Sequence, residues 1–309
     1  MRIQKLMRRP PPRIYAQKRI DDIRQTKSLA IAAPIESMNS VELVDTLAVY
    51  AGRVSTPPLK EGALVESPRE ALSSILGRAQ ELLPHLDPVL VVRIFSYLQS
   101  VSHISTSEYQ ELLNACVSRL ADLSIQQLVR LMFTVSVARR RLALDTVSFT
   151  ESCFSHMNLE ALGATTPPRL VAKLVVSSAM LATPTQTELV LPKLEHLVLS
   201  TITNLQPDQV QQVAFGLGRL GTKNTDLVNR ITMHALDITP IQDQKTYSSL
   251  LISLHRLNPP SPAWEAFKKI YRDHIGLGPS EPPHVSNIAE CLPRESEILV
   301  RRIRNALVH

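Results

Sequence analysis

Leu205-Gln-Pro-Asp-Gln-Val-Gln-Gln-Val-Ala-Phe-Gly-Leu-Gly-Arg-Leu220 is a phrase that this chain repeats. It is echoed by Lys245-Thr-Tyr-Ser-Ser-Leu-Leu-Ile-Ser-Leu-His-Arg-Leu257, and four fainter copies lie upstream. Aligned on Pro207, the six copies follow one another at intervals of 37 to 48 residues, which is typical of helical repeats. Their first positions are Ser40, Pro88, Ile125, Pro167, Pro207 and Gln244.

Apolar residues recur at fixed places in each copy. Positions three, seven and ten after the start share one side of a helix, because each residue turns the chain by about 100°. The column at three reads Leu43, Val91, Leu128, Leu170, Val210 and Tyr247. The column at seven reads Leu47, Phe95, Met132, Leu174, Ala214 and Leu251, and the column at ten reads Tyr50, Leu98, Val135, Ser177, Leu217 and Leu254. The pattern predicts a core-facing stripe that is repeated six times.

A second amphipathic stretch follows each copy after a short polar or proline-containing break. These stretches are Pro68 to Leu83, Ser107 to Leu120, Asp145 to Met157, Gln186 to Ile202, Thr225 to Leu236 and Ala263 to Ile275. Candidate N-caps are Ser67, Ser107, Asn224 and Ser261. We therefore expect an all-α fold, an α-solenoid of about six antiparallel helix pairs. The alternative is an irregular helical bundle, which has no reason to keep helix pairs in step at about 40 residues.

The predicted organisation is a basic extended arm over residues 1–35, a helical-repeat domain over 36–275, and a proline-containing linker with a short C-terminal amphipathic helix over 276–309. A hydrophobic content of 44% suits a packed helical core. No uninterrupted apolar run is long enough to cross a bilayer, so we expect no membrane insertion. The three cysteines are far apart and show neither a disulfide framework nor a zinc motif.

The positive charge of the chain is concentrated at its start. Met1 to Lys27 carries nine basic residues against Asp21 and Asp22, a net charge of +7, which leaves the other 282 residues at −1. Three interpretations are open: a mitochondrial targeting segment, a retained tail that contacts RNA phosphates, and a merely solvated terminus. The first two are compatible. The candidate RNA-binding residues of the arm are Arg2, Lys5, Arg8, Arg9, Arg13, Lys18 and Arg19.

Further basic residues fall in or near the turns that follow the first helix of later pairs. In a solenoid such turns line one edge, so we consider a phosphate-contacting rim. The alternative is that each cation interacts with the negative end of a helix dipole. The candidates are Arg139, Arg140, Arg141, Arg219, Lys223 and Arg256. The segment from Arg294 to His309 combines four arginines with Ile298, Leu299, Ile303 and Leu307, and either caps the solenoid or docks onto a partner.

Signatures of catalysis and of cofactor binding are missing. Gly216-Leu-Gly218 lies within an amphipathic stretch, where close helix packing explains it better than a phosphate loop. Cys153 and His156 share a helix face but lack the further ligands that a closed zinc site needs. We expect no catalytic residue, no cofactor and no metal, and therefore no enzyme.

The motif Leu-x-Pro-x-x-Val-x-x-Val-Ala-x-x-Leu-x-Arg-Leu-Gly over Leu205 to Gly221 resembles the repeats of organellar proteins of the heptatricopeptide, octotricopeptide and FAST-kinase-like group. The resemblance covers about Ser40 to Ile275. It implies a mitochondrial or plastid protein that acts on RNA processing, RNA stability or ribosome assembly. Many members also carry a RAP domain, and only 34 residues remain here after Ile275. The resemblance therefore lends no nuclease-like activity.

Three functions compete at this point. The first is a non-catalytic subunit of a ribonucleoprotein in the mitochondrial matrix, as a structural or assembly component of the mitochondrial ribosome. Its solenoid would bind proteins, and its arm would bind ribosomal or another mitochondrial RNA. The second is a stand-alone RNA-binding protein of mitochondrial RNA processing or stability. The third is a protein-only adaptor, such as an accessory subunit of a respiratory complex. The near-neutral body favours the first.

Overall fold

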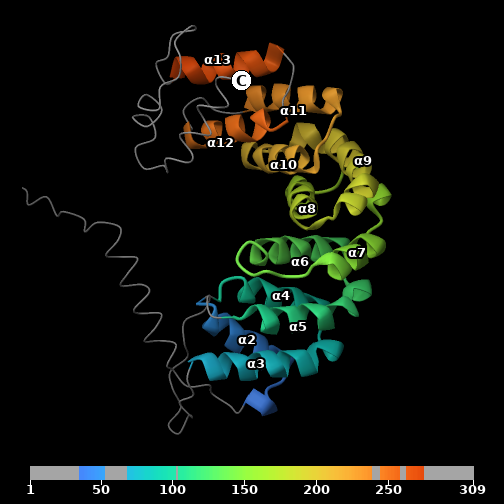
Figure 1. The fold of residues 1–309 in the computed structure, drawn as a ribbon, viewed down its shortest axis with the longest axis vertical. Helices are drawn as coiled ribbons and strands as arrows, with labels where there is room; N and C mark the ends of the chain where they lie inside the picture. The colour runs from blue at the N-terminus through green and yellow to red at the C-terminus, as the bar shows by residue number, and fades with distance from the viewer. Residues whose placement is uncertain (1–34, 53–67, 102–103, 239–243, 258–261, 275–309) are drawn as a thin grey trace, which may run out of the picture. The chain divides into compact units, whose positions relative to one another are not determined.

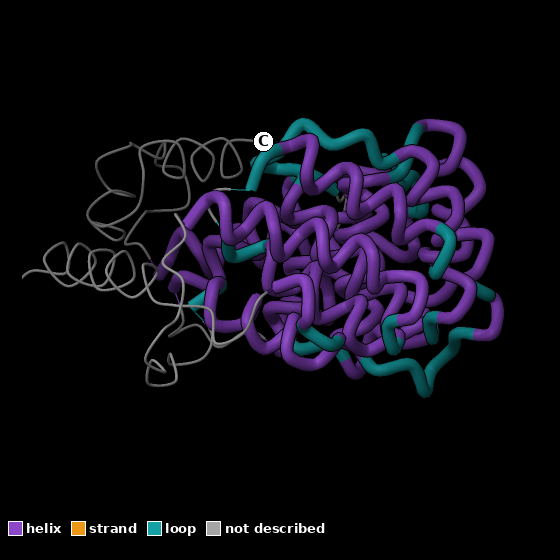
Figure 2. Tube along the Cα trace, turned by 90° about the horizontal axis from the view of Figure 1, so that it is seen from below, coloured by secondary structure: helices purple, strands orange, loops and turns teal. Residues whose placement is uncertain are grey.

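The computed structural model describes residues 35–52, 68–101, 104–238, 244–257 and 262–274 (Figure 1). Within these ranges all regular structure is helical, in twelve α-helices and five short 3-10 helices, and no strand occurs (Figure 2). The prediction of an all-α fold is confirmed. The basic arm and the segment from Arg294 to His309 lie outside the described residues, as do the candidate caps Ser67 and Ser261.

The helices alternate between two kinds, which we call first helices and second helices. The first helices are α2 (Ser40–Tyr50), α4 (Pro88–Leu98), α6 (Ile125–Ala138), α8 (Pro168–Leu181), α10 (Pro207–Leu220) and α12 (Gln244–His255). The second helices are α3 (Pro68–Leu82), α5 (Thr106–Val117), α7 (Val147–His156), α9 (Pro184–Thr201), α11 (Thr225–Ile238) and α13 (Pro262–His274). The 3-10 helices are η1 (Ile35–Ser37), η2 (Leu83–His85), η3 (Leu120–Asp122), η4 (Leu159–Ala161) and η5 (Ile202–Asn204). Each predicted first helix begins within one residue of its observed start.

The predicted apolar columns form the core, with one correction of register. All their members are buried except Leu170 and Tyr50, which are half-buried. In α8 the helix begins at Pro168, one residue later than the alignment placed it, and Val171 is fully buried where Leu170 was expected to be. Pro167 stands before the helix as its N-cap residue. The prediction was wrong by one place because either of the two successive prolines could be aligned with Pro207.

The described residues group into two compact units. Unit 1 comprises those within Met1–Asp122 and Ala138–Leu144, and unit 2 those within Leu123–Val137 and Asp145–His309. In unit 1, α2 contacts α3 and α4, and α3 contacts α5. In unit 2, α10 packs against both α8 and α12, while α11 contacts α9, α10 and α13 (Figure 1). Within each unit, first helices thus pack on first helices and second helices on second helices, although within the described residues α6 and α7 share no contact of comparable extent with a helix of their kind.

Capping side chains mark the helix starts, as Ser, Thr and Asn do in general. Asn224 accepts a hydrogen bond from the Leu227 amide at 3.1 Å, which confirms it as a cap. The prediction of Ser107 is wrong by two residues. Ser105 caps α5 instead, in a reciprocal capping box with Glu108, whose carboxylate accepts from the Ser105 amide at 2.9 Å.

Basic side chains from second helices reach back to the 3-10 helix or turn that ends the preceding second helix. Arg119, which follows α5, donates to the carbonyl oxygens of Leu83 at 2.7 Å, of Leu86 at 3.0 Å and of Pro84, which lie in or just after η2, the 3-10 helix that follows α3. In unit 2 the Nε2 atom of His234 lies 3.0 Å from the Leu205 carbonyl oxygen, in the equivalent place. These bonds satisfy carbonyls that a helix end leaves unpaired.

Gly216 lets two first helices approach closely. A Cβ atom at this position would lie 2.6 Å from Val175 Cγ1 and 3.0 Å from the Val175 carbonyl oxygen, both on α8. Gly218 faces Arg256 at the end of α12 in a similar way. The two glycines serve packing on both sides of α10, as expected from their place in an amphipathic helix.

Replacement of Arg119 by alanine should destabilise unit 1. The change removes a guanidinium that is bonded to three carbonyl oxygens, so we expect the free energy of unfolding to fall by about 3 kcal/mol in denaturant titrations. Arg119→Lys should lose less, because it keeps the charge but not the fork of donors. Asp122→Asn removes only the more exposed ion pair of Arg119 and should cost under about 1 kcal/mol. Equal effects of R119A and D122N would contradict the role of the carbonyls.

Replacement of Gly216 by alanine should also destabilise the protein, although alanine is the better helix former. The added methyl group meets backbone as well as side chain of α8, which costs about 1–3 kcal/mol. Gly77 in α3 provides a matched control, since a methyl group added there would have no neighbour within 4 Å. G77A should stabilise by up to about 1 kcal/mol. Stabilisation by both changes, measured as the unfolding midpoint, would refute tight packing at Gly216.

Candidate nucleic-acid interface

Three successive first helices, α4, α6 and α8, each carry a cation on the side that faces away from the core, and we call these three residues the cation column. Five residues after the helix start, α4 has Arg93, α6 has Arg130 and α8 has Lys173. This position lies nearly opposite the buried stripe, because a helix turns by about 100° per residue. Arg93 and Arg130 are exposed and Lys173 is half-buried. Arg93 belongs to unit 1, and the other two belong to unit 2.

In unit 2 the column forms part of a cluster of three cations and one ring. The Lys173 Nζ atom lies 5.1 Å from the centroid of the Phe133 ring, which links α8 to α6. Burial lowers the pKa of Lys173, and the positive charges of Arg169 and Arg130 lower it further. Neither α6 nor α8 contains an Asp or Glu. Within the described ranges no ion pair joins these cations to a carboxylate, so the cluster has an excess of positive charge.

A second cation and ring pair lies further along unit 2. The guanidinium carbon of Arg256, just after α12, is 4.8 Å from the centroid of the Phe215 ring on α10. Phe133 and Phe215 occupy the same repeat position, eight residues after their helix starts, and both are half-buried. Two contacts between a cation and an aromatic ring therefore lie along the first helices of unit 2, which is a combination that suits phosphates and bases.

The predicted rim residues divide between the two units. Arg139, Arg140 and Arg141 are exposed residues of unit 1. The Nη2 atom of Arg141 lies 3.5 Å from the Leu98 carbonyl oxygen, at the limit of a hydrogen bond. The structure does not place the two units relative to each other, so one continuous rim stays a prediction.

In unit 2 the predicted rim residues Arg256 and Arg219 make contacts with different first helices, α10 and α8. Gly218, next to Arg219, lies against Arg256. Arg219 Nε donates to the Ala179 carbonyl oxygen at 2.7 Å, which holds the end of α8. That bond matches the alternative of a cation at a helix C-terminus. Lys223 is exposed in the turn before α11. The seven candidates of the arm lie outside the described residues, and their role stays a prediction.

Sequence reasoning missed the cluster of Arg130, Arg169 and Lys173. The predicted basic sites were in the N-terminal arm and in or near turns, whereas these cations lie within helices whose pattern was interpreted only for its core positions. The one-residue error at Pro167 also moved Lys173 out of the column that it shares with Arg130. The signal that would have found them is the near absence of acidic residues from the first helices of unit 2.

Charge is separated between the two kinds of helix in unit 2. The acidic residues of the first helices α6, α8 and α10 amount to Asp208, against the cations Arg130, Arg169, Lys173 and Arg219. The second helices α7, α9 and α11 carry the cations Lys193 and Arg230, against the acidic residues Glu151, Glu188, Glu195, Asp226 and Asp237. Across these six helices the cations thus lie mainly on first helices and the carboxylates mainly on second helices, whereas the second helix α13 carries Lys268, Lys269 and Arg272 against Glu265 and Asp273.

Other chemistry is sparse in the described part of the chain. Cys116 and Cys153 are buried free thiols, and burial raises the pKa of Cys116 to about 12, which keeps it protonated and unreactive. The residues that the structure describes include no group of three or more His, Cys, Asp or Glu side chains arranged to hold a metal ion. Among the described helices, none has the length and apolar character needed to span a bilayer.

Neither the family models nor the curated proteins include a match to this chain. The resemblance to organellar helical-repeat proteins therefore stays an expectation. The features that bear on function are the cation column, the two phenylalanines and the separation of charge between the helix layers.

Proposed function

We propose that this protein is a non-catalytic helical-repeat protein that binds RNA through the outward side of the first helices of unit 2. In this proposal it works in the mitochondrial matrix as a structural or assembly subunit of a ribonucleoprotein, the mitochondrial ribosome. The observation that carries the proposal is the cluster of Arg130, Arg169 and Lys173 around Phe133, without a carboxylate on either helix.

The cluster suits an RNA strand for electrostatic reasons. Cations that repel one another raise the free energy of the unbound protein, and a phosphate placed among them removes that repulsion while releasing counterions from the RNA. Half-buried rings next to the cations provide faces for unstacked bases. A single strand offers both groups at once, whereas a duplex hides its bases.

The arrangement of helices supports the finer proposal of an α-solenoid with about six antiparallel pairs. First helices contact first helices and second helices contact second helices within each unit, as stacked pairs require. A solenoid would bring equivalent positions of successive pairs into rows, and it would carry the cation column as one such row. The basic side then faces RNA, and the acidic second helices α7, α9 and α11 remain for contacts with proteins.

The basic arm has two roles in this proposal. Its arginines and lack of early acidic residues support a mitochondrial targeting segment, and a retained arm adds phosphate contacts to those of the first helices. The cluster in unit 2 equally favours a stand-alone protein of mitochondrial RNA processing. Sedimentation of the tagged protein separates the two, because a ribosomal subunit travels with large ribonuclease-sensitive particles.

Neutralising the cluster should weaken RNA binding. The double variant Arg130→Gln and Lys173→Gln removes two phosphate contacts, so affinity for single-stranded RNA should fall at least about tenfold. The slope of log affinity against log salt should become shallower by about 1.4, since each contact to a single strand contributes about 0.7. Fluorescence anisotropy over a salt series measures both quantities on the full chain.

The matched control is Arg230→Gln. Arg230 is an exposed cation of the same unit, but it lies on the second helix α11 and pairs with Asp226 at 3.0 Å. Its loss should leave affinity unchanged within a factor of about two. Wild-type affinity in R130Q/K173Q, with binding abolished only by deletion of Met1 to Lys27, would assign the RNA contact to the arm and not to the first helices.

RNA affinity should depend on pH through Lys173. Only the charged ammonium attracts phosphate, and its lowered pKa means that it loses the proton at a lower pH than an ordinary lysine does. Affinity for an adenine homopolymer, whose bases do not titrate there, should fall as pH rises from about 7 to 10. Lys173→Arg should flatten this profile, because arginine stays charged. An identical pH profile in K173R would show that Lys173 does not touch the RNA.

A further inference from the structure

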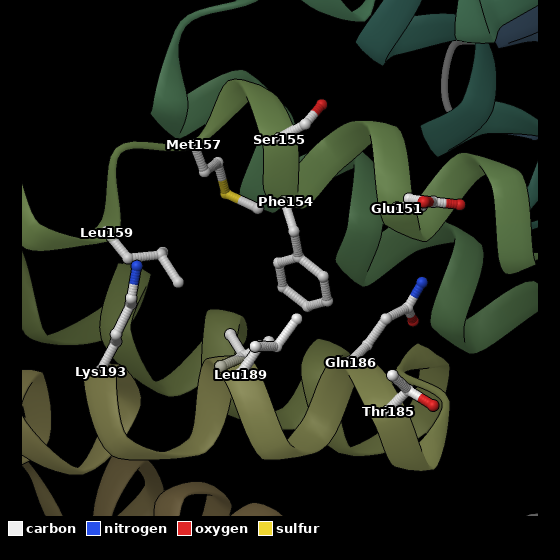
Figure 3. A pocket seen from close by; sticks show the side chains of 10 residues that line it. Glu151, Phe154, Ser155, Met157, Leu159, Thr185, Gln186, Leu189 and Lys193 are labelled. Atoms are coloured by element: carbon white, nitrogen blue, oxygen red, sulfur yellow. The ribbon is translucent and has the colours of Figure 1, made fainter.

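The second-helix side of unit 2 contains a pocket of about 350 Å³ between α7 and α9 (Figure 3). Its lining is mainly apolar, from Phe154, Met157, Leu159, Leu189 and Val190. The pocket lies within one compact unit and on the opposite kind of helix from the cation cluster. It is therefore a surface that the proposed RNA contact does not use.

The wall of the pocket that Leu189 forms is largely exposed in the described structure. Leu189 is 71% exposed, the largest exposed fraction among the large hydrophobic side chains of the described residues. The ring of Phe154 points from α7 into the space between the helices, toward Leu189 (Figure 3). Met157 and Val190 are buried at its base. Exposed apolar groups that line a shared depression are typical of a docking site.

Charged side chains lie at both ends of the pocket. Glu151 is exposed at one end and has no ion-pair or hydrogen-bond partner among the described residues. At the other end Lys193 pairs with Glu160 at 2.9 Å, an exposed pair that contributes little to stability. Glu188, next to Leu189, is a further exposed carboxylate of α9. The surroundings of the pocket are acidic, so an occupant with basic residues beside apolar ones fits them.

We propose that this pocket binds residues 294–309 of the same chain. That segment carries Arg294, Arg301, Arg302 and Arg304 against Glu295 and Glu297, a net charge of +2. From Ile298 onward it has three arginines and no Asp or Glu beside the apolar Ile298, Leu299, Ile303 and Leu307, which is the combination that the acidic pocket would attract. The leucine and isoleucine side chains enter between Phe154 and Leu189, and an arginine meets the unpaired carboxylate of Glu151.

The dimensions agree. Along α9, Thr185 and Lys193 are separated by about 12 Å, at 1.5 Å per residue. Leu299, Ile303 and Leu307 are spaced by four residues, so in helical form they present a stripe of the same length, about 12 Å, on one side. Two turns of an amphipathic helix therefore fill the pocket from end to end.

The connecting chain is long enough. From α13 to α9 the path through α11 involves two helix contacts, and packed helices are about 8–10 Å apart, so the stack adds about 20 Å. The 19 residues between His274 and Arg294 can span about 60 Å when extended. Tethering also raises the local concentration of the segment above that of any free peptide, which favours binding within the chain.

A cross-linking experiment on the full chain tests this proposal. The photoreactive amino acid benzoylphenylalanine replaces Leu189, and mass spectrometry identifies the attached peptides after irradiation. We expect most of the cross-linked product to join position 189 to residues 294–309 of the same chain. Met233 on α11 is the matched control position, because it is half exposed on a second helix and does not line the pocket. The same replacement at Met233 should give at least about tenfold less of this product.

Charge reversal provides the second measurement. Glu151→Lys should reduce the cross-link several-fold, and the further changes Arg301→Glu and Arg302→Glu should restore it. RNA affinity should respond to R130Q/K173Q and not to Glu151→Lys. A cross-link to a second copy of the chain, or to no part of residues 294–309, would overturn the proposal. So would equal yields at positions 189 and 233. None of these results bears on the RNA contact, which the anisotropy series tests separately.

Discussion

The burial of one apolar stripe on each first helix is the constraint on which the other features depend. Side chains at the third, seventh and tenth positions are almost all removed from water, and each Val, Leu, Phe or Met among them contributes about 1.5–3 kcal/mol when fully buried. In α10 this stripe lies between α8 and α12, which both pack against α10, and Gly216 permits the closer approach, that of α8. Once this side of the helix faces inward, the fifth position must face outward, and that is where Arg130 and Lys173 stand.

The sequence predicted the helices well because periodicity and proline are strong local signals. Pro88 and Pro207 each open a first helix, as proline does where an amide has no partner. Register was harder where Pro167 and Pro168 follow each other, and the capping residue of α5 was misplaced because several serines and threonines lie close together. Such ambiguities concern one or two residues, yet they decide which side of the helix a residue occupies.

The candidate site was less predictable, because a net charge does not say on which side of the molecule each charged residue lies. Residues 28–309 have a net charge of −1, and that value suggested that affinity for phosphate lies mainly in the N-terminal arm. In unit 2 the cations of the first helices and the acidic residues of the second helices cancel in the sum but not in space. Repeats make such a separation possible, because the same type of residue at one repeat position recurs on successive helices of the same kind.

A cluster such as that of Arg130, Arg169 and Lys173 is costly for the unbound protein. Lys173 loses hydration where it is covered, and the two guanidinium groups repel its charge, which is why its pKa is lowered. The cation-π contact with Phe133 offsets only part of this, at about 0.5–1 kcal/mol for an accessible site. A neutral side chain such as methionine would fill the same space without the repulsion. The three cations therefore make physical sense as a site prepared for an anion, and a polyanion that crosses several first helices would engage the whole row.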